Sequence, residues 1–334
     1  MQNFLKLTPT QRRTIYEQIA LRVGISDPRA IEKDVWVTSL LQIVFSLPYA
    51  DKFVFKGGSS LSKIWQLIHR FSEDIDLAID RSTFGLEGDL TKKQLKKLRK
   101  ESSLFVRDKL STDIKEQLTI HGLDGYCEVV PEPDGEGDAT YPEPRKIHIV
   151  YESVFDEGDG YLRPEVLLEV GARSLFEPTA EATVKSMISE NSEIETSVTD
   201  ARIVCAVPQK TFLEKAFLLH ELFTTEMGKR ANRKSRHLYD LEHLMAHSDI
   251  LSAVADADLW ETIRHHREIF TSIRGVDYEP DVRKRLVLVP PKEFEAEWRR
   301  DYEAMQRSMI YGDEISYDEL ISKIQNLQDA FRNT

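Results

Sequence analysis

The first part of the chain alternates between helical and strand patterns. Apolar side chains recur at helical spacing in four stretches, which predicts helices at about residues 9–23, 27–45, 59–69 and 91–118. The apolar run Phe53-Val54-Phe55 stops at Gly57-Gly58, which is typical of a strand that ends in a tight turn. Residues 74–80 alternate charged and apolar positions, which predicts a second strand.

The pattern changes in character near Pro208. Before it, four further apolar segments predict strands at about residues 126–130, 146–151, 166–170 and 202–206. The stretch 131–144 is rich in proline, glycine and acidic residues, and is predicted to be a solvent loop between strands. After it, helical spacing predicts five helices at about residues 210–227, 236–247, 257–270, 291–308 and 317–331. We therefore predict two domains, a mixed α/β domain over 1–207 and a helical domain over 208–334.

Composition narrows the class of protein. The chain has 334 residues, 41% of them apolar and 31% charged, which is ordinary for a globular protein and excludes a disordered one. Lys and Arg number 45 and Asp and Glu 57, so the net charge is −12, which argues against unspecific coating of nucleic acid but permits a local basic groove. No apolar stretch approaches the roughly 20 residues of a membrane span. With two cysteines and no secretory apolar region, a cytoplasmic location is expected.

Paired carboxylates mark the predicted strand 74–80. Asp74 and Asp76 are two residues apart, so on a strand both project from one face, with their Cα atoms about 6–7 Å apart. Hard oxygen ligands in this arrangement suit Mg²⁺, which proteins hold by one or two carboxylates together with substrate phosphates. A carboxylate pair of this kind is by itself weak evidence for a metal site, because most such pairs on protein surfaces are simply solvated.

A glycine turn precedes the carboxylate pair. Gly57 and Gly58 let backbone approach a phosphate closely, and Ser59 and Ser60 add hydroxyl donors at the start of the next predicted helix. Lys63 lies one turn further along and is a further candidate for phosphate binding. A phosphate cradle and a metal-binding pair joined by one helix would position a nucleoside triphosphate and its metal.

This strand–turn–helix–strand order resembles the DNA polymerase β-like nucleotidyltransferases. The runs KGGSSLSK and RFSEDIDLAID, with EKDVWV upstream at 32–37, resemble more closely the AbiEii/AbiGii-type toxin nucleotidyltransferases, which include the MenT toxins. The resemblance covers roughly residues 30–245 and is densest at 53–80. It implies an α+β (α/β) fold with a polymerase β-like core and a mixed sheet, followed by a helical domain that completes the active site.

The resemblance also implies roles for residues further along the chain. Glu169, the acid within the apolar run 166–170, matches the third metal-binding carboxylate, although a Glu that faces water is the alternative. Lys215 matches a lysine that family members need for activity and that would neutralise triphosphate charge; the alternative is a surface lysine. Asp240 lies in a match to the R-x-x-Y/F-D-L motif. It would orient Lys215 or act as a base, unless it only pairs with Arg236.

The function that the resemblance implies is transfer of NMP from an NTP, with Mg²⁺ or Mn²⁺, to an RNA acceptor such as a tRNA 3′ end. The protein would be the toxin of a toxin–antitoxin or phage-defence pair, with a separate antitoxin as partner. Two alternatives stay open, modification of a protein hydroxyl and a catalytically inactive binding module. Two basic clusters could contact RNA phosphates or simply be solvated: Lys92, Lys93, Lys96, Lys97, Arg99 and Lys100, and Lys229, Arg230, Arg233, Lys234 and Arg236.

Overall fold

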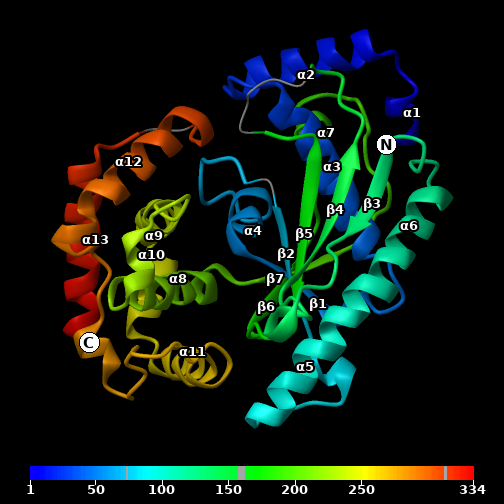
Figure 1. Ribbon diagram of the computed structural model, residues 1–334. Helices are drawn as coiled ribbons and strands as arrows, with labels where there is room; N and C mark the ends of the chain where they lie inside the picture. The colour runs from blue at the N-terminus through cyan, green and yellow to red at the C-terminus, as the bar shows by residue number, and fades with distance from the viewer. Residues whose placement is uncertain (73, 157–161, 312–313) are drawn as a thin grey trace. The chain divides into compact units, whose positions relative to one another are not determined.

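The computed structural model describes residues 1–72, 74–156, 162–311 and 314–334, and Figure 1 shows its ribbon. Contacts divide the chain into two units. The first unit comprises Met1–Ile64 and Phe71–Cys205, and the second comprises Trp65–Arg70 and Ala206–Thr334. The second unit thus begins close to the predicted residue 208, but it also takes in the short segment 65–70, which the sequence had placed in the first domain.

A mixed sheet of seven strands forms the centre of the first unit, in the order β3-β4-β5-β2-β1-β7-β6. Strand β2 lies inside it, antiparallel to β1 and parallel to β5. Strands β3 and β4 form an antiparallel pair on either side of the predicted loop. The strands are β1 (Phe53–Lys56), β2 (Asp74–Ile79), β3 (Cys127–Pro131), β4 (Arg145–Tyr151), β5 (Glu165–Gly171), β6 (Thr179–Ala182) and β7 (Ile203–Ala206). Of these, β6 lacks a clear apolar pattern and was not predicted.

The two faces of this sheet differ in polarity because strand side chains alternate. Buried apolar residues such as Ile75 and Leu168 occupy one face, and helix α3 (Arg29–Val44) packs against β2 and β5 (Figure 1). Nearly every residue of α3 is buried, as its long apolar pattern predicted. The opposite face carries half-exposed polar side chains, including those of β4 and β5, whose burial alternates along the strand. Polar chemistry is therefore concentrated on one face of the sheet.

The remaining helices of the first unit mostly follow the sequence pattern. Thr8 accepts a hydrogen bond from the backbone N–H of Gln11 in a capping box. This cap starts helix α2 at Pro9, the predicted first residue. The predicted helix 91–118 is a continuous helical run with a π-helical segment, Phe105–Leu110, in its middle. The helices are α1 (Gln2–Leu5), α2 (Pro9–Val23), α4 (Gly57–Lys63), α5 (Lys92–Leu104), α6 (Ser111–Ile120) and α7 (Met187–Asn191).

One helix prediction was wrong at its end. The spacing predicted a helix over 59–69, but α4 ends at Lys63 and Gln66 has a positive φ of 53°. Residues 65–70 pack instead in the second unit, where Trp65 Nε1 donates to the Ala206 carbonyl at 3.1 Å and Ile68 is buried. Tertiary contacts of these apolar side chains override their local helical spacing.

The second unit is mainly helical. Aromatic side chains build its core: the rings of Phe217 and Trp260 stack with centroids 4.4 Å apart, and Trp298 is fully buried. The helices are α8 (Pro208–Phe223), α9 (Arg236–Met245), α10 (Ser248–Leu251), α11 (Ala257–Phe270), α12 (Lys292–Met309) and α13 (Tyr317–Arg332). Within the described residues, no helix combines the length and the hydropathy needed to span a membrane.

Candidate functional site

Asp74 and Asp76 lie on the polar face of strand β2. Their neighbour Ile75 points into the core, so both aspartates project from the same side, as predicted, and both are half-buried. The register places Asp76 directly opposite Glu169 of the parallel strand β5, and Asp74 opposite Leu167. Asp76 makes no hydrogen bond or ion pair with the residues that the structure describes. A half-buried carboxylate of this kind is free to accept a ligand cation.

Glu169 has a partner that sequence reasoning did not find. Its carboxylate pairs at 3.0 Å with the ammonium of Lys146, which stands directly opposite on strand β4. The half-buried position of Glu169 needs a compensating charge, and Lys146 supplies it, so a metal is not required for that purpose. Burial lowers the pKa of Lys146, but the hydrogen bond and charge of Glu169, then the charges of Glu132 and Asp74, outweigh this and raise it.

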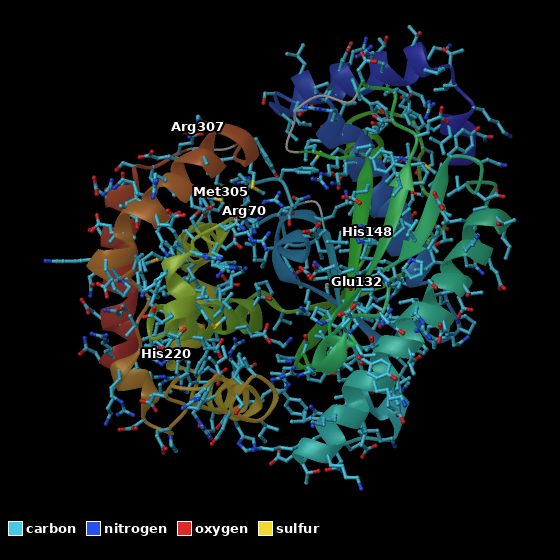
Figure 2. The ribbon with its side chains drawn as sticks, in the orientation of Figure 1. Arg70, Glu132, His148, His220, Met305 and Arg307 are labelled. Atoms are coloured by element: carbon cyan, nitrogen blue, oxygen red, sulfur yellow. The ribbon has the colours of Figure 1, made fainter. Side chains whose placement is uncertain are left out.

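The predicted metal ligands are close in register but do not form a carboxylate cluster. Among the described residues, no group of three or more His, Cys, Asp or Glu side chains is placed to hold a metal ion. The pair Asp74 and Asp76 keeps the geometry and the hard oxygen atoms that suit Mg²⁺ or Mn²⁺. The third residue, Glu169, already has one of its carboxylate oxygens bonded to Lys146. Nearby, His148 Nδ1 of β4 lies within hydrogen-bond distance, 3.0 Å, of a carboxylate oxygen of Glu165 on β5 (Figure 2 labels His148).

The glycine turn lies against the carboxylate pair. Gly57 has a φ of +79°, and a Cβ built on it would stand 2.3 Å from Oδ2 of Asp76. Because no side chain fits there, only glycine allows this backbone to lie so close to the carboxylate. Gly57 and Gly58 are the first residues of helix α4, which therefore starts two residues before the predicted residue 59.

The serines of the turn use their hydroxyls within the motif. Ser59 donates to the carbonyl of Asp74 and lies 2.8 Å from the Ser72 hydroxyl, and Ser60 donates to the Gly57 carbonyl at 2.9 Å. Both serines are buried. These contacts connect the turn to strand β2, so the two hydroxyls stabilise the local structure. A phosphate here would meet backbone N–H groups rather than the predicted hydroxyl donors.

Lys63 faces helix α3. Its ammonium forms a largely buried ion pair with Asp34, whose other oxygen accepts the backbone N–H of Met187 at 2.6 Å. Asp34 belongs to the run 32–37 that carries part of the family resemblance. The ion pair with Asp34 connects α4 to α3 through Lys63. The predicted contact of Lys63 with a nucleotide stays a prediction.

In the second unit, Lys215 and Asp240 form a buried ion pair. Asp240 is completely buried, and its Oδ2 lies 2.8 Å from the Lys215 ammonium. Arg70 closes the group, with bonds of 2.7 and 2.8 Å to the two oxygens of Asp240. Burial alone would raise the pKa of Asp240, but Arg70 and Lys215 outweigh it and hold that pKa far below its usual range. Burial lowers the pKa of Lys215, against the opposing charge of Asp240.

Sequence reasoning missed Arg70 and His237. Arg70 begins the run RFSEDID that carries the family resemblance, but its partner is 170 residues away and no local pattern reveals it. His237 lies next to the motif residue Arg236, and its Nδ1 atom is buried with no hydrogen-bond partner in the described parts of the chain. Burial, and then the charges of Lys215 and Arg236, hold the pKa of His237 well below its ordinary value, so its ring is neutral near pH 7.

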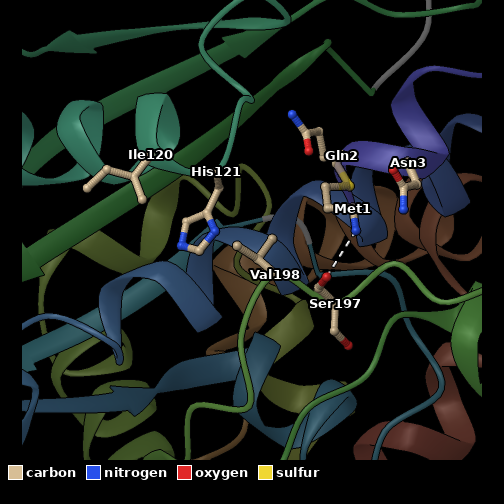
Figure 3. A pocket seen from close by; sticks show the side chains of 7 residues that line it. All are labelled: Met1, Gln2, Asn3, Ile120, His121, Ser197 and Val198. Carbon is tan, nitrogen blue, oxygen red and sulfur yellow. Dashed lines mark hydrogen bonds between the residues drawn. The ribbon is translucent and has the colours of Figure 1, made fainter.

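A pocket of about 270 Å³ lies elsewhere in the first unit, around the N-terminus (Figure 3). The Met1 ammonium donates to the Ser197 carbonyl at 2.9 Å there, and His121 also lines the pocket. None of its lining residues is a predicted site residue. The candidate site therefore rests on the sheet face and the glycine turn.

Replacing Gly57 by alanine tests the close approach of turn and carboxylate. We expect kcat/KM to fall about tenfold to a hundredfold, because the new Cβ must displace the Asp76 carboxylate and alanine pays about 1–2 kcal/mol at positive φ. Steady-state kinetics would measure this. Gly85→Ala is a matched control, since Gly85 also has a positive φ (64°) but open space around its Cβ position. Equal losses in both variants would contradict the proximity argument.

The chain matches the family model described as nucleotidyl transferase AbiEii toxin of a type IV toxin–antitoxin system, over residues 40–331. The matched range includes the glycine turn, the sheet carboxylates and the Lys215–Asp240 pair, so the protein is a nucleotidyltransferase. It belongs to the AbiEii nucleotidyl transferase toxin family, which confirms the resemblance found in the sequence. No curated protein matches the chain.

Proposed function

We propose that this toxin transfers a nucleoside monophosphate from an NTP to the hydroxyl of an RNA acceptor, such as a tRNA 3′ end, and that transfer depends on Mg²⁺ or Mn²⁺. The observation that carries the proposal is the placement of Asp74 and Asp76 on one sheet face with Gly57 against the Asp76 carboxylate. It brings oxygen ligands for a cation next to backbone that a phosphate can approach. The mixed sheet of the first unit is compatible with the polymerase β-like core that we assign to it.

In the proposed reaction the acceptor hydroxyl oxygen bonds to the α-phosphorus, the α–β bridging P–O bond breaks, and pyrophosphate leaves while the hydroxyl proton passes to solvent. A bound divalent cation supplies charge neutralisation for the phosphates and makes the hydroxyl oxygen more nucleophilic. Asp74 and Asp76 would hold that cation from one face of strand β2. Gly57 keeps the turn free of side-chain atoms beside it.

For the second unit we keep the role that the resemblance implies for Lys215, neutralisation of triphosphate charge. Its contacts favour an orienting role for Asp240 over the role of a base. Both oxygens of Asp240 already accept bonds from cations, and its depressed pKa makes it a poor proton acceptor. Arg70 takes up the charge of Asp240 from the other side, so Lys215 keeps part of its positive charge available for an anion.

Helix α5 supports RNA as the acceptor. Its buried side, with Leu98, packs inward, while its outer side is strongly basic. Exposed lysines recur there at i and i+4, which places their ammonium groups on one face: Lys92, Lys93, Lys96, Lys97 and Lys100. Lys92, Lys93 and Lys96 form no ion pair within the described residues. A local group of exposed lysines in a chain of net charge −12 is the feature expected where a phosphate backbone binds.

The variant Lys92→Gln/Lys93→Gln/Lys96→Gln tests this surface. We expect the Kd for RNA at about 0.1 M salt to rise about tenfold, and the slope of log K against log salt to become shallower by about 2, because fewer counterions are released. Fluorescence anisotropy over a salt series would measure both. The control Lys6→Gln/Lys115→Gln/Lys185→Gln removes the same charge from exposed positions of the same unit. Equal effects in both variants would mean that net charge, not α5, governs RNA binding.

The experiment for the function as a whole follows an α-³²P-labelled NTP. Purified protein is incubated with each NTP, Mg²⁺, total tRNA and a cell extract, and RNA and protein are separated. We expect label in the tRNA fraction, lost when a chelator is added. Label in a protein band would show instead a transferase for protein hydroxyls, and label in neither fraction would contradict transfer.

We further propose that the toxin acts in the cytoplasm, where these substrates are, that a separate antitoxin protects the cell, and that the pair serves in phage defence.

A further inference from the structure

The carboxylates of the site belong to a row of charges that crosses the sheet. From β1 to β4, four residues stand directly opposite one another in the register: Lys56, Asp76, Glu169 and Lys146. Beyond them, the backbone N–H of Lys146 donates to the Glu132 carboxylate at 3.2 Å (Figure 2 labels Glu132). The two acids are thus neighbours in the middle of the row, and a lysine stands on each side.

Neighbouring like charges on adjacent strands repel. Each carboxylate therefore lowers its electrostatic energy by turning away from the other acid and toward the lysine on its own side of the row. Glu169 does so: it bonds to Lys146 at 3.0 Å, with one quarter of its side chain exposed. Asp76 makes no such bond to Lys56 or to any other described residue. The two carboxylates of the row therefore differ. Asp76 lies against the glycine turn without a bond to the described residues, and Glu169 is bonded to Lys146.

We propose that Lys146 is the positioning residue of Glu169, and that its ammonium competes with a divalent cation for this carboxylate. With Lys146 engaged, the site offers the cation Asp74 and Asp76; with the ion pair broken, Glu169 can swing toward Asp76, its register partner, as a third oxygen ligand. The proposal rests on the metal-binding role proposed for Asp74 and Asp76. On this proposal, binding of the cation at the site includes its replacement of Lys146 as the partner of Glu169.

The test measures Mn²⁺ binding without nucleotide, from the EPR signal of free Mn²⁺. We expect Lys146→Met to bind Mn²⁺ about fivefold more tightly than the wild type, the size expected for loss of a competing, partly exposed ion pair. Lys146→Arg keeps the ion pair and should restore wild-type affinity. Thermal unfolding checks that each variant is folded, which the partly exposed position of Lys146 favours.

A double-mutant cycle separates competition for Glu169 from a general charge effect. In a Glu169→Gln background, Lys146→Met should change the Mn²⁺ affinity less than twofold, because the group for which the two cations compete is gone. Lys56→Met is the matched control, since it removes a charge beside Asp76 without breaking an ion pair to Glu169. An unchanged or weaker affinity in Lys146→Met, or a fivefold gain that persists in the Glu169→Gln background, would overturn the proposal.

The metal-binding role of the aspartates can fail separately. If the wild type and Asp74→Asn/Asp76→Asn bind Mn²⁺ equally, the proposed metal centre is wrong, whatever Lys146 does. If binding needs both aspartates but Lys146→Met leaves it unchanged, the metal centre stands and only the competition is refuted.

Discussion

Transfer of the labelled nucleotide is expected to fall by about a thousandfold or more in kcat/KM when Asp74 and Asp76 are both replaced by asparagine. The reason is electrostatic. Asparagine keeps the shape of the side chain but removes both negative charges from the strand face on which the cation is to be held. Steady-state kinetics with an α-³²P-labelled NTP and tRNA would measure the loss, and growth of cells that express the variant should recover.

The control for this prediction is Asp51→Asn/Asp124→Asn, which removes the same charge from two exposed positions of the first unit. It should transfer nucleotide at the wild-type rate. Thermal unfolding should show that the double variant at β2 remains folded, because Asp74 and Asp76 are only half-buried. A folded Asp74→Asn/Asp76→Asn protein that still arrests growth and transfers nucleotide would refute the proposed mechanism.

Features that depend on local sequence could be predicted. Thr8 caps its helix through Gln11, and the alternation of Asp74, Ile75 and Asp76 sets one polar and one buried face of β2. The polar face of the site follows from that alternation alone. The glycine turn was likewise visible, because Gly57 requires a positive φ that other residues adopt rarely.

Features that depend on long-range pairing could not be predicted. Lys146 meets Glu169 only because β4 and β5 pair in one register, and a shift by one residue would turn the lysine to the other face. The Arg70–Asp240 contact joins positions 170 residues apart. The apolar spacing after Ser59 was real, but it served contacts of residues 65–70 in the second unit rather than a longer helix.

The same reasoning separates two kinds of lysine that look alike in the sequence. Lys63 and Lys215 both lie on predicted helices, and the sequence made both candidates for binding phosphate. The structure gives each a buried aspartate, Asp34 and Asp240. Among the described residues, Asp240 also accepts bonds from Arg70, whereas the other oxygen of Asp34 accepts the backbone N–H of Met187. Because Asp240 shares its single charge between Arg70 and Lys215, it neutralises Lys215 less completely than Asp34 neutralises Lys63, which favours Lys215 as the lysine that meets an anion.

The largest effect on stability is expected for Asp240→Asn. This change removes the carboxylate charge that Arg70 and Lys215 both bond in a buried position, which should lower the free energy of unfolding by about 3–5 kcal/mol. Urea unfolding at pH 7 would measure it. Arg70→Met/Asp240→Asn/Lys215→Met is the informative companion, because replacing a whole buried ionic group by neutral side chains costs far less than removing one member. If Asp240→Asn alone is as stable as the wild type, the group does not hold the second unit together.

The dependence of this effect on pH follows from the depressed pKa of Asp240. Burial opposes ionisation, but Arg70 and Lys215 outweigh it, so the folded protein keeps the carboxylate charged at pH values where the unfolded chain protonates it at about 3.9. Its contribution to stability is therefore full above about pH 5 and is lost progressively as the pH falls below about 4. The wild type should lose its advantage over Asp240→Asn in that range. A stability difference that stays constant from pH 7 to pH 3 would show that Asp240 acts by packing and not by charge.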